Sequence, residues 1–318
     1  MNEQQHKDKV KVAVLIPCFN EEHAIAQVVK DFMEVLPDAS IYVYDNNSTD
    51  RTVERAVEAG AVVRREPLQG KGNVVRRMFR EIHADCYVMV DGDGTYDPAD
   101  APALVNAVLE EQVDMAIGDR LSTTYFQENK RPFHNMGNRL VRNLINRFWN
   151  TDIRDIMTGY RAFSRRFVKL FPVMSPHFEI ETEMTVHALD KRFVIKTLPT
   201  RYADRTVGES KLNTYKDGFK ILRTIFSLFE EYRPMLFFGV ISALLILIAV
   251  LLFIPILVEF FRTGLVPRFP TLFCAGFLAV IGGMSFFTGV CLDVIIRKDK
   301  KNYELKLVDF QEDEEKSC

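Results

Sequence analysis

The sequence predicts an α/β domain with a mostly parallel sheet, followed by an amphipathic helix and two transmembrane helices. Short β-branched apolar runs alternate with helix-length segments over residues 10–90, which is typical of a parallel sheet covered by helices on both faces. Polar clusters follow three of these runs, and two long apolar runs come after Arg233. We therefore divide the chain into an α/β domain (1–212), an amphipathic helix (213–233), a two-helix membrane anchor (234–297) and a charged tail (298–318).

The first part of the α/β domain is read from the order of its apolar runs. We expect strands at residues 10–16, 41–44, 61–64 and 86–90, and helices at 22–35, 49–59 and 73–82. Pro17 follows the first run, and Gly60 is placed to end the second helix. Ligands of such sheets bind beyond the carboxyl ends of the strands. The clusters CFNEE, DNNSTD and DGDGT are therefore expected to form a single site.

The two apolar runs are long enough to cross a membrane. Met235–Val258 contains no charged residue, and Thr271–Ile296 contains only Asp293, near its end. As a helix the first run would be roughly 36 Å long, more than the ~30 Å of a hydrocarbon core. The alternative is a buried hairpin of a soluble protein. We disfavour it because the two runs have too few polar positions to form a solvent face.

The distribution of lysine and arginine predicts the orientation of these spans. Basic residues flank the outer ends of the pair and are fewer in the linker, which has Arg262 and Arg268. Both termini and the α/β domain are therefore expected on the cytoplasmic side of a multi-pass inner-membrane protein. The segment 214–233 has phenylalanine and leucine at helical spacing with lysines between them, so we expect an interfacial amphipathic helix there.

Composition excludes several classes of protein. The net charge is −2, which does not support a nucleic-acid binder. The five cysteines are scattered and include no CxxC pair, so neither a disulfide framework nor a zinc site is expected. The polar start MNEQQHKDK does not look like a cleavable signal peptide. The sequence leaves open whether the chain forms a homo-oligomer.

Asp91 and Asp93 form the motif with the most direct chemical meaning. They follow the apolar run YVMV within DGDGTYDP, at alternate positions, so their carboxylates can converge on one point. Paired carboxylates suit a hard divalent cation that also binds phosphate oxygens, Mg²⁺ or Mn²⁺. Acidic turns produce such pairs by chance. The strand before this pair and the other polar clusters favour a metal site.

These motifs together resemble those of a known enzyme family. VAVLIPCFNEE, DNNSTDRT, QGKGN and VDGD occur in the order typical of family 2 glycosyltransferases with the GT-A fold, a Rossmann-like α/β fold. GYRAFSR, FEIETEM and DRTVGESKL resemble the branch that contains dolichol-phosphate mannose synthase and bacterial polyprenyl-phosphate glycosyltransferases. The resemblance covers about residues 10–230. It implies sugar transfer from a nucleotide diphosphate, with UDP-sugar favoured and GDP-mannose as the alternative, to undecaprenyl or dolichyl phosphate.

The resemblance also implies which residues bind the donor. The nucleotide would be lined by Pro17, Phe19, Asn20 and Glu22, and Asp45 would accept a hydrogen bond from the base. Asp91 would lie near the sugar diphosphate, and Asp93 would be the metal ligand. Related mannose synthases often have glutamine two residues after that ligand, where this chain has Thr95. A water molecule would then complete the metal shell.

Two basic segments are expected to contact the donor diphosphate. Lys71 lies between Gly70 and Gly72, which allow the backbone to approach a ligand closely; the alternative is an ordinary tight turn. The segment DRTVGESKL resembles a loop that closes over the donor in this branch. Its candidate residues are Arg205, Ser210 and Lys211.

A separate basic set is expected to bind the acceptor phosphate. The resemblance assigns this role to Arg120 and to arginines in the following helix, of which Arg139 and Arg142 are three apart and share a helix face. For Arg142 and for Arg131, ordinary surface charge is an equal alternative. Arg161 in TGYRAFS is a candidate for a phosphate contact or a structural contact.

Glu181 in FEIETEM is the remaining catalytic candidate. Relatives that transfer sugar to a hydroxyl group use an acidic residue near this position as a base. A phosphate monoester is already largely ionised near neutral pH, since its second pKa is about 6, so a strong base is less necessary. Glu181 would then orient the acceptor or the arginines.

Two other functions remain open at this point. A processive polysaccharide synthase usually has a (Q/R)xxRW motif, and Trp149, the single tryptophan, lies in LINRFWN instead. A non-catalytic membrane scaffold with the same fold would not need the intact pair Asp91 and Asp93. One turnover assay would separate an enzyme from a scaffold.

Overall fold

The computed structural model describes residues 10–122, 132–175, 179–203, 230 and 232–317. The chain divides into two units, Met1–Gly218 and Phe219–Cys318, which we describe separately. The predicted donor-binding residues Arg205, Ser210 and Lys211 lie outside the described residues, as does Arg131. The same holds for most of the predicted amphipathic helix at 213–233.

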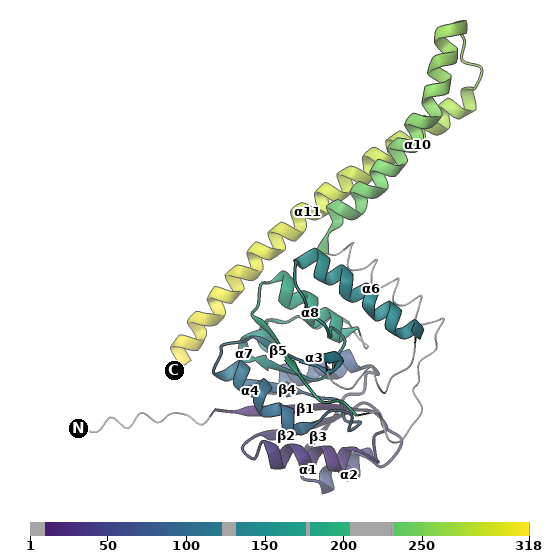
Figure 1. Cartoon of the computed structure of the whole chain (residues 1–318). Helices are drawn as coiled ribbons and strands as arrows, with labels where there is room; N and C mark the ends of the chain where they lie inside the picture. The colour runs from purple at the N-terminus through teal and green to yellow at the C-terminus, as the bar shows by residue number, and fades with distance from the viewer. Residues whose placement is uncertain (1–9, 123–131, 176–178, 204–229, 231, 318) are drawn as a thin grey trace. The chain divides into compact units, whose positions relative to one another are not determined.

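The first half of the α/β unit alternates strands and helices as the sequence predicts (Figure 1). Its elements are β1 (Val12–Cys18), α1 (Ile25–Val35), β2 (Ser40–Asp45), α2 (Thr52–Glu58), β3 (Val62–Arg65), α3 (Lys71–Glu81) and β4 (Cys86–Met89). The four predicted strands and three predicted helices are therefore confirmed. Most boundaries shift by one to three residues, and β1 continues through Pro17. Pairing of β1 with β4 stops at Leu15, so the missing N–H of Pro17 costs no ladder bond.

The second half completes the sheet with strands that the sequence analysis did not place. Its elements are the 3-10 turn η1 (Pro98–Asp100), α4 (Ala101–Leu109), β5 (Met115–Asp119), the 3-10 turn η2 (Arg120–Ser122), α6 (Pro132–Trp149), β6 (Arg161–Ser164), α7 (Arg165–Leu170), α8 (Ile180–Asp190) and β7 (Ile195–Pro199). The sheet order is β3-β2-β1-β4-β6-β5-β7. Among the strands that the structure describes, only β6 runs antiparallel to its neighbours, β4 and β5.

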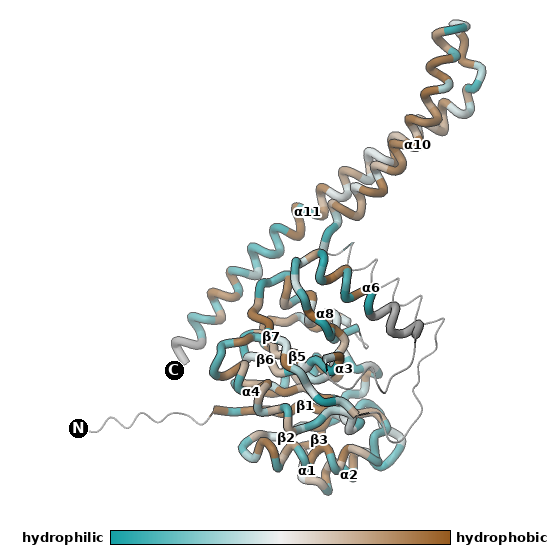
Figure 2. Tube along the Cα trace, in the orientation of Figure 1, coloured by the Kyte–Doolittle hydropathy of each residue, from teal (hydrophilic) through white to brown (hydrophobic). Residues whose placement is uncertain are grey.

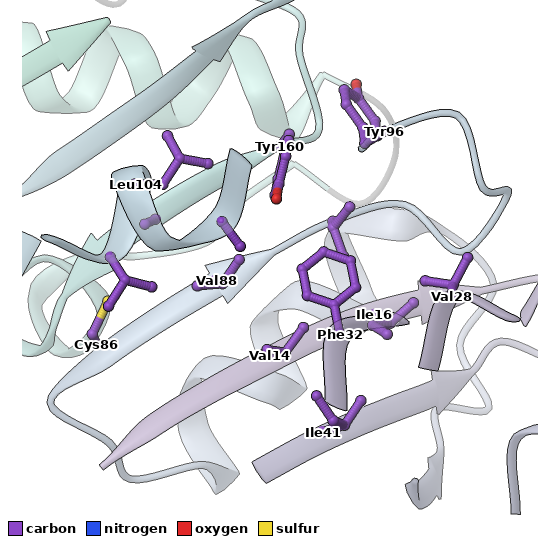
Figure 3. Packing of buried hydrophobic residues seen from close by; sticks show 14 of the residues in the cluster. Val14, Ile16, Val28, Phe32, Ile41, Cys86, Val88, Tyr96, Leu104 and Tyr160 are labelled. Carbon is purple, nitrogen blue, oxygen red and sulfur yellow. The ribbon is translucent and has the colours of Figure 1, made fainter. Parts of the chain in front are cut away.

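Alternate residues of the central strands point to opposite faces of the sheet. Val14 and Ile16 of β1 belong to the cluster covered by α1, α2 and α4. Within it Phe32 and Tyr160 meet edge to face with ring centroids 6.2 Å apart (Figure 3). Helices α3 and α7 pack on the other face, where the rings of Phe79 and Phe163 are 5.7 Å apart. The period of two along the strands thus produces a three-layer unit.

The direction of the strands decides where the site lies. Because β6 reverses direction between β4 and β5, the ends of β1, β2, β4 and β5 all reach the same edge of the sheet. The segments after these strands begin at Phe19, Asn46, Val90 and Arg120. The predicted polar clusters therefore meet at one edge, as the parallel arrangement requires.

In its described residues, the second unit contains two long apolar helices, α10 (Pro234–Thr263) and α11 (Phe269–Ser317). Both are long and apolar enough to cross a membrane. Figure 2 shows hydrophobic residues along α10 and the first part of α11 and more hydrophilic residues toward the C-terminus. Leu251 and Phe287 are 59 % and 68 % exposed. A buried soluble hairpin would cover such side chains, so this alternative does not fit.

Small residues bring the two helices close together. A Cβ atom added at Gly282 would lie 2.9 Å from Ile246, and one at Gly289 would lie 3.0 Å from Phe238. Ser285 Oγ donates to the carbonyl of Phe238 at 3.1 Å. Helix pairs in lipid depend on such close contact, because the lipid chains are as apolar as the side chains. Helix α11 continues through the predicted charged tail to Ser317.

Candidate active site

The loops that follow β1 and β2 at the sheet edge are joined by direct hydrogen bonds. Asn20, whose φ is 56°, accepts a hydrogen bond from the Thr49 backbone N–H at 2.8 Å and donates its own N–H to Ser48 Oγ at 2.9 Å. Glu22 accepts a bond from the Arg51 N–H at 3.1 Å. Asn20 and Glu22, predicted to line the nucleotide, therefore also fix the loop after β1 against the loop after β2.

Asp45 and Asn46 at the end of β2 organise the next two loops. Asp45 is buried, and its carboxylate accepts the backbone N–H groups of Asn47 and Ser48 at 3.2 and 3.1 Å. The side chain of Asn46 donates to the carbonyls of Glu66 and Leu68 and accepts the N–H of Gly70, the last at 2.7 Å. Asn46, which was not among the predicted site residues, thus holds the loop that leads into α3.

Lys71 is the first residue of α3 and lies between two carboxylates. Gly70 has a φ of 130°, which only glycine adopts readily, and it turns the chain into the helix. Lys71 Nζ is 2.5 Å from Asp91 Oδ1 and 2.5 Å from Glu181 Oε1. These three predicted residues, from three separate elements, therefore form one cluster.

The negative charges of Asp91 and Glu181 offset the effect of burial on the Lys71 ammonium. Only 8 % of the Lys71 side chain is exposed. Burial would lower the pKa of the Lys71 ammonium, but the charges of Asp91 and Glu181 outweigh this effect and raise it. Lys71 is thus a cation in contact with Asp91, one of the two predicted metal ligands.

Asp93 lies in a tight turn, and its carboxylate accepts two hydrogen bonds from Thr95. Thr95 Oγ1 donates to Asp93 Oδ1 at 2.8 Å, and the Thr95 N–H donates to the same oxygen at 3.2 Å. No group of three His, Cys, Asp or Glu side chains that could hold a metal occurs among the described residues. Two carboxylates without a full protein cage fit a hard cation that takes its other ligands from phosphate and water, as Mg²⁺ and Mn²⁺ do.

Gly159 and Tyr96 connect the Asp91 side of the site to the Arg120 side. A Cβ atom at Gly159 would collide with the carboxylate of Asp91, so only glycine leaves room there. The Gly159 N–H donates to the hydroxyl oxygen of Tyr96 at 3.0 Å. Arg120 also donates to this oxygen, at 3.4 Å. One buried tyrosine therefore touches both halves of the site.

Arg120 is held in place by several partners at the end of β5. Its Nε is 2.8 Å from Asp155 Oδ2, and its NH2 group donates to the Met157 carbonyl at 3.3 Å. Its guanidinium lies 5.5 Å from the ring centroid of Tyr202. Asp155 was not among the predicted site residues, although it lies four residues before the motif GYR.

Arg161 does not fit the predicted phosphate contact. Its side chain is completely buried on β6. The guanidinium donates to the carbonyls of Ile156 and Thr158 and to Thr185 Oγ1 at 2.8 Å. Burial lowers the pKa of Arg161 to about 10, and the charges of Glu181 and Asp155 oppose this shift. Its burial and these bonds favour the structural role over the phosphate contact.

Comparison with known proteins identifies the family. The family described as Glycosyl transferase family 2 matches residues 13–171. The chain belongs to this family. Glycosyltransferase AglJ of Haloferax volcanii is 34 % identical over 230 residues, which cover 72 % of this chain and 75 % of that protein. Dolichol-phosphate mannosyltransferase of Pyrococcus furiosus is 29 % identical over 231 residues, which cover 70 % and 64 %.

Solved structures confirm the GT-A fold of the glycosyltransferase. Glucosyl-3-phosphoglycerate synthase from Mycobacterium tuberculosis, solved with Mn²⁺, UDP-glucose and phosphoglyceric acid, superposes with a TM-score of 0.57. The sequences are 21 % identical, and the match covers 70 % of this chain and 79 % of that one. At this identity the likeness establishes the fold and leaves the ligands to be argued from the site.

The remaining predicted residues of the glycosyltransferase lie on the surface of the first unit. Phe19 is 37 % exposed just after β1, and Pro17 is partly buried within it. Arg139 is exposed on α6, and Arg142 is partly buried on the same helix. Their contacts with nucleotide and acceptor stay predictions.

Proposed function

We propose that this glycosyltransferase moves a sugar from a nucleotide diphosphate to a polyprenyl phosphate at the cytoplasmic face of the inner membrane. The observation that carries the proposal is the pairing of two charged groups at one sheet edge. Asp91, Asp93 and Lys71 form a group suited to a metal-bound diphosphate, and Arg120 forms a second cationic point next to it. A chain with two apolar helices brings such a site close to lipid.

The donor half of the site suits a nucleoside diphosphate sugar with Mg²⁺ or Mn²⁺. Asp93 and Asp91 would bind the cation, which would neutralise charge on the leaving diphosphate. Lys71 adds a fixed positive charge beside them. A UDP-sugar is the first donor to test and GDP-mannose the alternative, since the superposed synthase was solved with UDP-glucose and Mn²⁺.

The acceptor half suits a phosphate monoester. Arg120 is a planar donor held by Asp155 and the Met157 carbonyl, so it is already oriented before a ligand arrives. Arg139 and Arg142 on α6 would add positive charge for the same ligand. Relatives named dolichol-phosphate mannosyltransferase and dolichyl-phosphate hexose transferase support a lipid phosphate acceptor.

We propose direct transfer with inversion at the anomeric carbon. The lipid phosphate would attack from the side opposite the leaving nucleotide. Of the site carboxylates, Asp91 and Glu181 are paired with Lys71, and Asp93 is bonded to Thr95. This arrangement does not favour a carboxylate nucleophile, which a covalent two-step reaction would need.

Mass spectrometry of lipid products tests the proposal. Full-length protein in membranes would be given undecaprenyl or dolichyl phosphate, Mn²⁺ and one nucleotide sugar at a time. We expect a lipid phosphate that carries one sugar, with a β-linkage formed from an α-linked donor. An α-linked product would overturn the inverting mechanism. A growing polysaccharide would favour the synthase alternative, and no product with any donor would favour a scaffold.

A further inference from the structure

The two carboxylates that bind Lys71 differ in their access to ligands. Asp91 follows β4, and 31 % of its side chain is exposed. Glu181 lies in the first turn of α8, and only 6 % of its side chain is exposed. A ligand at the sheet edge can therefore reach Asp91 far more easily than Glu181.

Glu181 is fixed from the interior of the domain. Its carbonyl accepts a hydrogen bond from Thr185 Oγ1 at 3.0 Å, and Thr185 Oγ1 in turn accepts one from Arg161 at 2.8 Å. Its carboxylate lies at the N-terminal end of α8, where the helix dipole stabilises negative charge. Thr185 and Arg161 thus connect the turn of α8 that carries Glu181 to the core.

We infer that Glu181 is a positioning residue that holds the Lys71 ammonium beside Asp91, and that it does not accept a proton from the acceptor. The inference rests on the proposed function, in which the acceptor is a phosphate that is already ionised. Glu181 then acts on the donor half of the site, through Lys71.

A lysine needs this support because its side chain is long and flexible. The ammonium is a compact charge on a four-carbon stem with three N–H donors. Asp91 and Glu181 accept two hydrogen bonds from it in the described part of the chain. The third N–H can then point to an oxygen of the diphosphate. Without Glu181, the ammonium would be tied only to Asp91, the residue that is also needed for the cation.

A double-mutant cycle on nucleotide binding tests the inference without any transfer reaction. Calorimetry on full-length protein would measure the affinity for UDP, or for GDP if UDP does not bind, in the presence of Mn²⁺. We expect Lys71→Met and Glu181→Leu each to weaken binding about tenfold, the factor of one charge-assisted hydrogen bond. The double variant should be no weaker than either single variant, because both remove the same contact.

Glu181→Gln and Glu183→Gln serve as controls. The amide of Glu181→Gln would keep an oxygen that accepts from Lys71 and should recover most of the affinity, which also guards against misfolding of the leucine variant. Glu183, two residues along α8, accepts the N–H groups of Met174 and Ser175 and should have no effect on nucleotide affinity. Additive losses in the double variant, or normal affinity in Glu181→Leu, would overturn the inference.

The transfer assay separates this result from the proposed function. If Glu181 were the base, Glu181→Gln would lower kcat by about 10²–10⁴-fold at unchanged nucleotide affinity. We expect less than a tenfold loss. A wild type that binds nucleotide but modifies no lipid phosphate would refute the proposed function and leave the binding cycle readable. A wild type that binds neither nucleotide would refute both.

Discussion

The Asp93 side chain has a structural contact and a proposed metal-binding role. Its Oδ1 accepts two bonds from Thr95 and thereby shapes the turn after β4. Its carboxylate also carries the charge that a divalent cation would need. Because both tasks use oxygen atoms, they can be separated by a substitution that keeps the oxygen and removes the charge.

We expect Asp93→Asn to remove activity while the fold persists. The amide oxygen can still accept from Thr95, but it is a far weaker ligand for Mg²⁺ or Mn²⁺. Transfer should fall about 100-fold or more, since a bound cation supplies several kcal/mol of charge stabilisation. EDTA should have the same effect on the wild type, and Mn²⁺ should reverse it. Full activity in chelator would contradict the metal assignment.

Replacement of Arg120 should impair use of the acceptor but not binding of the donor nucleotide. We expect Arg120→Ala to raise the KM for the lipid phosphate or to lower kcat at least tenfold, because a charged hydrogen bond to phosphate is lost. Nucleotide affinity should change less than twofold.

Arg120→Lys keeps a cation for the buried Asp155 and controls for instability. The exposed Arg154, on the loop near Asp155, is a matched control that should leave both constants unchanged. Loss of nucleotide affinity alone would contradict the division of the site.

At the scale of elements, α3 carries Lys71 at one end and a stabilising charge network at the other. Glu81, the last residue of α3, accepts hydrogen bonds from Tyr44 of β2 and Arg64 of β3 at 2.8 and 2.7 Å. Arg77 of the same helix donates to it at 2.7 Å. This network ties α3 to the edge of the sheet and so supports the position of Lys71.

The Glu81 network should make stability depend on pH. Burial would raise the pKa of Glu81, but the bonds from Arg64, Arg77 and Tyr44 lower it to about 2, against an ordinary value of 4.5. Because the folded pKa is below the unfolded one, the stabilisation is complete above pH 4.5 and is lost as the pH falls toward 2. We expect about 1–2 kcal/mol at neutral pH, less than the full shift implies, because the side chain is 30 % exposed.

Thermal unfolding of full-length protein tests this contribution. Glu81→Gln should lower the midpoint by roughly 2–6 °C at pH 7, and the difference should shrink as the pH falls below about 4.5. Glu58→Gln, at an exposed position of α2, is the control and should leave the midpoint unchanged at both pH values. An equal loss at pH 7 and pH 3 would mean that packing, rather than charge, accounts for the effect.

At the scale of the whole molecule, the two units supply different properties. The unit Met1–Gly218 has its own sheet and core, whereas α10 and α11 expose most of their apolar side chains. An exposed apolar surface of this kind marks a membrane or protein contact, and the length of both helices favours a membrane. The first unit therefore supplies the site, and the second is expected to keep that site at the depth of lipid headgroups.

Truncation after Arg233 should separate these two contributions. We expect the shortened protein to bind nucleotide with Mn²⁺ as the full chain does, because Asp91, Lys71 and Asp93 are retained. Its kcat/KM for long-chain lipid phosphate in membranes should fall at least tenfold, whereas a short soluble phosphate analogue should be used about equally well by both forms. Undiminished rates with long lipids would show that the helices serve another purpose, such as assembly.

The local pattern of the sequence determined the elements and the type of site. The strands and helices up to Met89, the two apolar helices and the charged clusters at strand ends follow from short-range periodicity and residue chemistry, which depend on neighbours in the chain. Asp91 and Asp93 were predictable as candidates for the same reason, since they follow an apolar run that ends at the sheet edge, whereas Arg120 was a candidate only through the resemblance to the family.

Only the tertiary structure decided which of these residues touch. The ion pairs of Lys71 join positions 20 and 110 residues apart in the chain, and Arg120 reaches Asp155 across 35 residues. The burial of Arg161 depends on β6 being antiparallel between β4 and β5, a strand that periodicity did not reveal. Contacts between distant segments follow from the order and direction of the strands. For this reason the sequence predicted the chemistry at the sheet edge, but the pairing of Lys71 with Glu181 appeared only in the folded domain.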